Sequence, residues 1–266
     1  MEAEPGGPSL YRLAEFLGSV CVRFTKRLGS VLILFAETLK EMLFPPFEIK
    51  NTFKQMQEVG VKSVPVVVIT AVFTGMVLAF QTFTGFKRFG AEALVGTVVA
   101  LSMTREMGPV LTGLVVAGRA GAAMAAELGT MRVTEQIDAL ETLSTSPVKY
   151  LIVPRFVSSM IMLPCLTIIA DMLGILGGYA IAVWLYGMSS ALYWRRAWNY
   201  LEMNDIYGGL AKACFFGAAI AIVCCYRGFY TEGGAEGVGK ATTGAVVISF
   251  MTILISDYFL GAWLLK

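Results

Sequence analysis

The chain has 266 residues, of which 56% are hydrophobic and 15% are charged, and its formal net charge is +2. Several apolar runs approach the roughly 20 residues needed to cross a hydrocarbon core of about 30 Å, so the composition predicts an all-α polytopic membrane protein and argues against nucleic-acid binding. The chain contains no histidine, which removes the commonest general base and the commonest metal ligand, and we expect neither a catalytic site nor a metal site.

Residues 1–62 are predicted to form an N-terminal leader, an amphipathic helix and a linker. Residues 1–8 are expected to be a flexible leader. From Ser9 to about Phe44, apolar residues recur every three to four positions with basic residues between them, a pattern typical of an amphipathic helix at the membrane interface. Prolines end this helix, and residues 47–62 are expected to be a polar linker. Whether the helix dips into the lipid or only lies on it stays open.

Residues 63–266 are predicted to form a domain with five membrane spans. The second apolar run, residues 93–126, exceeds the bilayer thickness at about 1.5 Å per residue, so a tilt or a break is expected at Gly108-Pro109. The other runs are separated by expected loops at 188–204 and 227–243. The five expected spans are 63–83, 93–126, 148–186, 205–226 and 244–265.

The distribution of Lys and Arg predicts the orientation of these spans. Residues 1–62 are rich in basic residues, whereas the loops after the first and third spans carry two each. The positive-inside rule therefore places the N-terminus and the segments 130–147 and 227–243 in the cytoplasm, and the C-terminus on the other side. The sequence shows no internal repeat, so any two-fold symmetry is expected to come from a homodimer.

Arg105 and Glu106 interrupt the apolar second span. Charges at membrane depth are costly and normally face a cavity or a partner. The Arg could pair with a phosphate, and the Glu could hold the Arg or bond a lipid headgroup. The alternative is a structural ion pair without a ligand. Further along this span, Arg119 and Glu127 are interpreted as helix-packing residues, and Asp171 in the third span as an interhelical hydrogen-bond partner.

The segment TEQIDALETL, residues 134–143, is a short amphipathic helix between two spans. Thr134 is predicted to cap it, Glu135 complements the helix dipole, and Ile137, Leu140 and Leu143 share a face. One interpretation is a coupling helix seated in a groove of a cytoplasmic ATPase. The other is a solvated connector lying on the bilayer.

The segment GAEGVGKA, residues 234–241, nearly matches a phosphate-binding loop. Ala241 stands where that loop needs a hydroxyl for Mg²⁺, and an apolar helix precedes the segment where a strand is required. We therefore expect no ATP site in this chain.

The ordered series REMGP, AGR, AELGTM and EQIDAL, followed by VPR (153–155) and GVGKATTGAVV (237–247), closely resembles the signature of the MlaE/YrbE permease family, the membrane subunits of MCE-type lipid-transport ABC systems. The similarity covers roughly residues 60–266. The family pattern continues past EQIDAL with Met-Gly and Asp-Pro, where this chain has Leu143-Ser144 and Ser146-Pro147.

The resemblance implies a lipid site, because the corresponding Arg-Glu pair in the family lies beside a central lipid-binding cavity between two protomers. Arg105 and Glu106 are therefore expected to bind lipid. Phe83, Phe86 and Phe89 are weaker candidates for acyl-chain contact, with plain packing as the alternative. The residues expected to couple to an ATPase are Glu135, Gln136, Ile137, Asp138, Ala139 and Leu140.

The resemblance also implies the function: a non-catalytic permease subunit of an ABC transporter in a bacterial inner membrane, which moves phospholipid or a similar lipid and is concerned with outer membrane lipid asymmetry. The implied partners are a cytoplasmic ABC ATPase that binds ATP and Mg²⁺, a periplasmic MCE-domain protein, a STAS-domain accessory protein and a second copy of the chain. Two alternatives stay open: an intramembrane lipid-modifying enzyme that uses Arg105, Glu106 and Asp171, and a non-transporting scaffold for MCE assembly.

Overall fold

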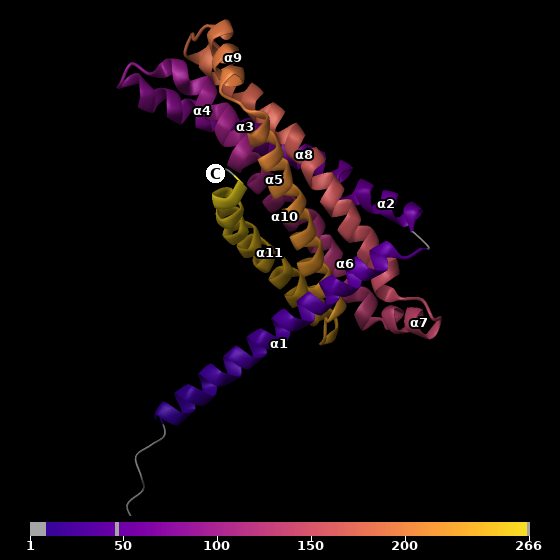
Figure 1. Ribbon diagram of the computed structural model, residues 1–266. Helices are drawn as coiled ribbons and strands as arrows, with labels where there is room; N and C mark the ends of the chain where they lie inside the picture. Colours follow the sequence, from indigo (N-terminus) through magenta and orange to yellow (C-terminus); the bar gives the residue numbers. More distant parts are fainter. Residues whose placement is uncertain (1–8, 46–47, 265–266) are drawn as a thin grey trace, which may run out of the picture.

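The computed structural model describes residues 9–45 and 48–264, and this part of the chain is built from helices without strands (Figure 1). Short 3-10 turns at Val61–Ser63 and Glu92–Leu94 and π-helical turns at Met103–Met107, Ala117–Gly121, Val148–Ile152 and Ile181–Leu185 join or interrupt the helices. The helices are α1 Ser9–Leu43, α2 Ile49–Val59, α3 Val64–Lys87, α4 Val95–Ser102, α5 Gly108–Val116, α6 Ala122–Val133, α7 Gln136–Thr142, α8 Val153–Ala180, α9 Ser190–Asn199, α10 Met203–Phe229 and α11 Gly234–Leu264.

Five helical segments in the described part are long and apolar enough to cross a membrane, which confirms the predicted all-α polytopic fold. The third and fourth match the predicted runs closely, the second ends at Val133 instead of residue 126, and the first and the last begin earlier than predicted. The five segments are Ile49–Lys87, Glu92–Val133, Val148–Leu185, Met203–Phe229 and Gly234–Leu264.

Three stretches predicted to be irregular are helical. The linker at 47–62 contains α2, whose Gln55 and Val59 are buried and which packs along α8. The loop at 188–204 contains α9, which buries Tyr193 and Ala197. Each helix buries one side against the rest of the protein, and this packing stabilises it. The loop at 227–243 is shorter than predicted because α11 already begins at Gly234.

The second span continues through Gly108-Pro109 instead of breaking there. The π-helical turn Met103–Met107 lies directly before this pair. Pro109 has no N–H to donate to the carbonyl of Arg105 four residues earlier, and that carbonyl instead accepts a hydrogen bond from Lys212 Nζ at 3.2 Å. The π-helical turn therefore lets the helix continue through the proline. The same turn directs Arg105 and Glu106 towards α10.

Close helix contacts in the bundle depend on small residues. A Cβ atom at Gly75 of α3 would lie 1.9 Å from the carbonyl oxygen of Gly174 of α8, and one at Gly177 would lie 2.4 Å from the carbonyl oxygen of Val72. Side chains larger than hydrogen do not fit here, so α3 and α8 pack backbone to backbone, as membrane helices with small residues do.

The bundle has two distinct ends (Figure 1). The helices α4 and α9 lie at one end, and α7 lies at the other, beside the C-terminal part of α1. The predicted helix from Ser9 is confirmed as α1, which extends away from the bundle (Figure 1). Its position at a membrane interface stays a prediction, and the expected leader at 1–8 lies outside the described residues.

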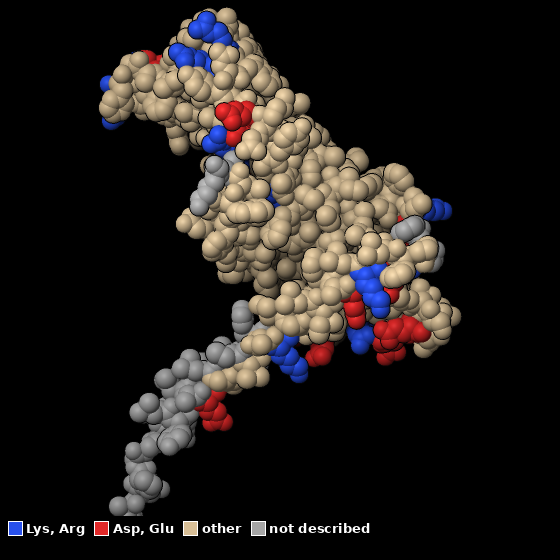
Figure 2. Space-filling model, in the orientation of Figure 1, with Lys and Arg blue, Asp and Glu red and all other residues tan. Residues whose placement is uncertain are grey.

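The distribution of charge agrees with a membrane-embedded middle. On the face shown in Figure 2, most Lys, Arg, Asp and Glu side chains gather at the two ends of the molecule, and the broad band between them is largely uncharged. A band of this kind suits the hydrocarbon core of a bilayer.

Candidate functional site

Arg105 and Glu106 both leave the π-helical turn of the second span, but their ion pairs within the described chain are with α10 rather than with each other. Arg105 Nε and Nη2 each lie 2.7 Å from Asp205 Oδ1. Glu106 Oε2 lies 2.6 Å from Lys212 Nζ. Glu106 therefore does not hold Arg105, which was one of the possibilities the sequence left open, because the turn directs the two side chains to separate partners.

Lys212 is the centre of this charged cluster, which comprises Arg105, Glu106, Asp205, Lys212 and Asp257. Its side chain has no exposed surface, and its ammonium also donates to Asp257 Oδ1 at 3.1 Å. With the bonds to Glu106 and to the Arg105 carbonyl, all three donors of the ammonium are used. Lys212 thus ties the second, fourth and fifth spans together.

The cluster is buried on one side and open on the other. Lys212 is fully buried and the side chain of Asp205 is 3% exposed, whereas the side chains of Arg105 and Glu106 are 38% and 42% exposed. The inner groups fix the positions of the two outer ones. The outer groups offer a guanidinium and a carboxylate side by side, which suits a phosphate and a polar headgroup.

Asp205, Lys212 and Asp257 were not identified from the sequence as site residues. Lys212 and Asp257 are charged residues within apolar helices, the same signal that singled out Arg105. The sequence predicts only that Asp205 begins a span. In the structure its Oδ2 accepts a hydrogen bond from the Glu202 N–H at 3.1 Å and so caps α10.

The three phenylalanines proposed for acyl-chain contact have different surroundings. Phe83 is buried and stacks on Tyr186 with ring centroids 3.9 Å apart. Phe86 packs partly buried against the same hydrophobic cluster, and Phe89 is 83% exposed. Phe83 and Phe86 are therefore packing residues in this structure, and Phe89 is the one of the three with a largely exposed ring.

The remaining charged residues of the second and third spans contact neighbouring helices. Arg119 Nε donates to Ser63 Oγ at 2.9 Å and its Nη2 to the Glu58 carbonyl. Glu127 pairs with Arg155 at 2.8 Å. These contacts agree with a helix-packing role. Asp171 differs, because its Oδ1 is buried without a hydrogen-bond partner among the described residues, so that oxygen does not make the expected interhelical bond.

The short helix predicted at residues 134–143 exists as α7, but it begins two residues later than expected, and its coupling role stays a prediction. Thr134 does not cap it; the Thr134 hydroxyl bonds back to the Thr130 carbonyl at 2.8 Å and ends α6. Glu135 occupies the N-cap position with a left-handed φ of 59° and without a side-chain cap bond. The sharp turn at Glu135 directs α7 away from the axis of α6.

One face of α7 is fixed and the other is open. Ile137 is fully buried, and Leu140 packs partly buried against the same cluster. Leu143 lies outside this apolar face and is 74% exposed. Asp138 pairs with Arg132 of α6. The exposed residues of the segment 134–143 are Thr134, Glu135, Gln136, Ala139, Glu141, Thr142 and Leu143.

The glycine-rich segment that resembles a phosphate-binding loop is helical. Lys240 lies in α11 and pairs with Glu236 one turn earlier at 2.6 Å on an exposed surface. A helix cannot wrap a phosphate with successive N–H groups as that loop does. In the described part of the chain, no group of three or more His, Cys, Asp or Glu side chains could hold a metal ion.

Comparisons with known proteins agree with this architecture. The family model described as Permease MlaE matches residues 52–263. A probable ABC transporter permease protein from Rickettsia conorii is 47% identical over 251 residues, which cover 94% of this chain and 97% of the relative. A probable ABC transporter permease protein from Synechocystis is 43% identical over 90% of this chain and 91% of the relative.

A plant protein is also similar. The chloroplastic protein trigalactosyldiacylglycerol 1 of Arabidopsis thaliana is 39% identical over 88% of this chain and 67% of the relative. The family match and the near full-length similarity to the bacterial permeases agree with each other. The chain therefore belongs to the MlaE permease family of ABC transporter permeases.

Proposed function

We propose that this chain is the membrane-spanning subunit of an ABC transporter that moves phospholipid or a similar lipid between the bacterial inner membrane and a periplasmic MCE-domain protein. The family membership supports an ABC permease. The name of the Arabidopsis relative refers to a glycerolipid, which supports a lipid cargo. The chain itself carries out no chemistry in this proposal.

The observation that carries the lipid assignment is the half-buried charged cluster. Arg105 is held by Asp205 while 38% of its side chain stays exposed. In this proposal its guanidinium binds the lipid phosphate, and Glu106, held by Lys212, accepts a hydrogen bond from the headgroup. A preorganised cation and carboxylate at membrane depth are expected in a site for a polar headgroup. Phe89 is the phenylalanine free to contact acyl chains in this conformation, and Phe83 and Phe86 would first have to leave their packing.

The second part of the proposal concerns energy coupling. The exposed face of α7 docks on a cytoplasmic ATPase, through Glu135, Gln136 and Ala139, while Ile137, Asp138 and Leu140 hold α7 against the bundle. ATP and Mg²⁺ bind on that partner. The α7 end then faces the cytoplasm together with the N-terminus, and the C-terminus faces the periplasm. Two copies of the chain enclose the lipid path, and a STAS-domain protein joins the ATPase.

The test uses the exposed position Ala139. We would purify the tagged full-length chain from native membranes and identify co-purifying proteins and lipids by mass spectrometry, comparing wild type with Ala139→Arg. The matched control is Ala191→Arg, an exposed alanine on α9 at the other end of the bundle. We expect wild type and Ala191→Arg to retain an ATPase and an MCE protein, and Ala139→Arg to lose the ATPase selectively. If the wild type and both variants are each recovered without an ATPase and without an MCE protein, the transporter proposal is overturned.

A further inference from the structure

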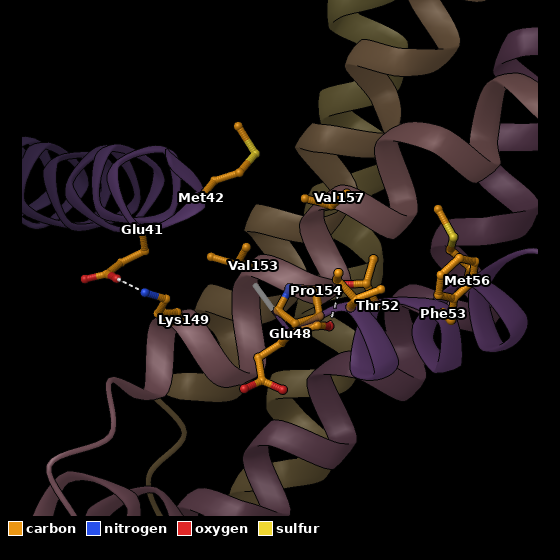
Figure 3. Close-up of a pocket in the computed structure, with 11 residues that line it drawn as sticks. Glu41, Met42, Glu48, Thr52, Phe53, Met56, Lys149, Val153, Pro154 and Val157 are labelled. Carbon is orange, nitrogen blue, oxygen red and sulfur yellow. Dashed lines mark hydrogen bonds and ion pairs between the residues drawn. The ribbon is translucent and has the colours of Figure 1, made fainter. Parts of the chain in front are cut away.

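A cavity of about 330 Å³ lies where α1, α2 and the first turns of α8 meet (Figure 3). Its walls are mainly apolar, and its volume falls in the range of small-molecule pockets, about 300 to 1,000 Å³. Among the described residues, the apolar side chains that line it are Met42, Ile49, Phe53, Met56, Val153, Pro154 and Val157.

A second cavity of about 350 Å³ adjoins the first, and its lining is polar. Three charged residues line both cavities, Glu41, Glu48 and Lys149, and they are called the charged rim below. The rest of the second cavity is lined by residues 144–146 and Tyr150, directly after α7. An apolar chamber and a polar chamber joined at a charged rim have the form of a binding site for an amphiphile.

Within the described residues, the hydrogen bonds of Lys149 leave donor capacity for a ligand. Its ammonium carries three donors and bonds the Pro45 carbonyl at 3.0 Å. Its contact with Glu41 Oε2 is 3.8 Å long, which exceeds hydrogen-bond distance, and Figure 3 shows the two side chains pointing toward one another. The side chains of Lys149 and Glu41 are 20% and 30% exposed, so both are accessible while being partly desolvated.

The surroundings indicate that the ligand comes from the membrane. Ile49 and Phe53 line the apolar cavity and are 61% and 66% exposed on α2, and Leu43 at the end of α1 is 72% exposed. Because α2 continues directly into a membrane span, this exposed apolar surface lies where α2 enters the bilayer. The cavity is therefore placed to receive an acyl chain of a neighbouring lipid.

The charges of the rim select the headgroup. One lysine and two glutamates give a rim of net charge −1 when all are ionised, which repels an anionic headgroup and suits one that carries both signs. We propose that this junction binds one zwitterionic phospholipid of the phosphatidylethanolamine type. Its phosphate contacts Lys149, its ammonium contacts Glu41 and Glu48, and an acyl chain fills the apolar cavity.

This site is separate from the proposed transport path. The charged cluster around Lys212 joins the second, fourth and fifth spans, whereas the charged rim joins the end of α1, the N-cap of α2 and the π-helical turn before α8. The polar cavity is walled by the segment that follows α7, so a bound lipid contacts the connection between the coupling helix and α8. The lipid would hold α1 and α2 together beside that connection.

The experiment measures which lipid the protein retains. The full-length chain with its co-purifying partners is reconstituted in nanodiscs of equal phosphatidylethanolamine and phosphatidylglycerol, released into mild detergent and examined by native mass spectrometry. We expect wild type to retain phosphatidylethanolamine in preference to phosphatidylglycerol. The double variant Glu41→Gln/Glu48→Gln changes the rim from −1 to +1 and should move the retained ratio about tenfold towards phosphatidylglycerol, as expected for a charge-assisted contact.

Two further variants make the result specific. Glu232→Gln/Glu236→Gln removes two exposed carboxylates elsewhere and should leave the ratio unchanged. Val157→Trp fills the apolar cavity and should abolish retention at this site, with folding verified by gel filtration. Equal retention of both lipids by wild type, or the same ratio in both double variants, would each overturn the proposal.

Discussion

The ammonium of Lys212 lies 2.6 Å from the carboxylate of Glu106, and the lysine side chain is fully buried while the glutamate side chain is 42% exposed. A buried ammonium is tolerated only when its donors are satisfied. Glu106, Asp257 and the Arg105 carbonyl satisfy all of them. Glu106, which the sequence suggests as a ligand contact, therefore also compensates the buried charge of Lys212.

Replacing Lys212 alone should be more damaging than replacing it together with Glu106 and Asp257. Lys212→Met leaves Glu106 and Asp257 without their shared cation, and loss of one partner of a buried pair costs about 3–5 kcal/mol of unfolding free energy. We expect the low end of this range because water screens the exposed part of Glu106. Thermal unfolding of the purified protein in detergent measures the loss.

The compensating variant is Lys212→Met/Glu106→Gln/Asp257→Asn. It should recover most of the lost stability, because no charge is then left unpaired in the cluster. Equal destabilisation of the single and the triple variant would show that Lys212 acts through packing rather than charge compensation.

Arg105→Lys should impair lipid transfer even though it keeps the positive charge. The guanidinium uses Nε and Nη2 on Asp205 and still presents Nη1, whereas an ammonium cannot span a carboxylate and a phosphate in this fixed geometry. We expect transfer from vesicles by the reconstituted complex to fall about tenfold, which corresponds to one charge-assisted bond. Arg195→Lys on the exposed surface of α9 is the control, and an equal rate in both variants would contradict a phosphate-binding role for Arg105.

The spans could be predicted from the sequence because an apolar run of membrane length has few alternatives. The helices α2 and α9 could not be predicted, because their many polar residues are typical of loops. Only the structure shows that Val59 and Tyr193 are buried against other helices. The same limit applies to the site. Arg105 and Glu106 were found as isolated charges, but their partners lie about a hundred residues away in sequence, and the pairing of Lys212 with Glu106 depends on how α10 packs.

Gly75→Ala should disrupt the packing of α3 on α8. The added Cβ would lie 1.9 Å from the Gly174 carbonyl oxygen and 2.6 Å from its carbon, and backbone atoms cannot move aside as a flexible side chain can. We expect a loss of about 1–3 kcal/mol, the usual cost of overpacking, or more. Gly85→Ala on the same helix meets nothing within 4 Å and should be nearly neutral or slightly stabilising. Comparison of the two unfolding temperatures in detergent checks this, and equal values would contradict the close approach of α3 and α8.

Substitutions at Glu135 can distinguish the effect of backbone strain on stability from the effect of the side chain on partner binding. Its φ of 59° costs a non-glycine residue roughly 1 kcal/mol or more, so Glu135→Gly should leave stability unchanged or slightly raised after the added freedom of the unfolded chain is included. Glu135→Val places a β-branched residue at positive φ and should destabilise the protein clearly. Glu141→Val, at an exposed helical position, is the control and should show only the small propensity difference.

The same variants then test the coupling role of Glu135. If its carboxylate contacts the ATPase, Glu135→Gly should release the ATPase during purification while its unfolding temperature stays at or above that of wild type. A stable Glu135→Gly protein that keeps the ATPase at the wild-type level would show that Glu135 serves only to turn the chain from α6 into α7. Loss of the ATPase together with stability would contradict the strain argument, because glycine should adopt this conformation without cost.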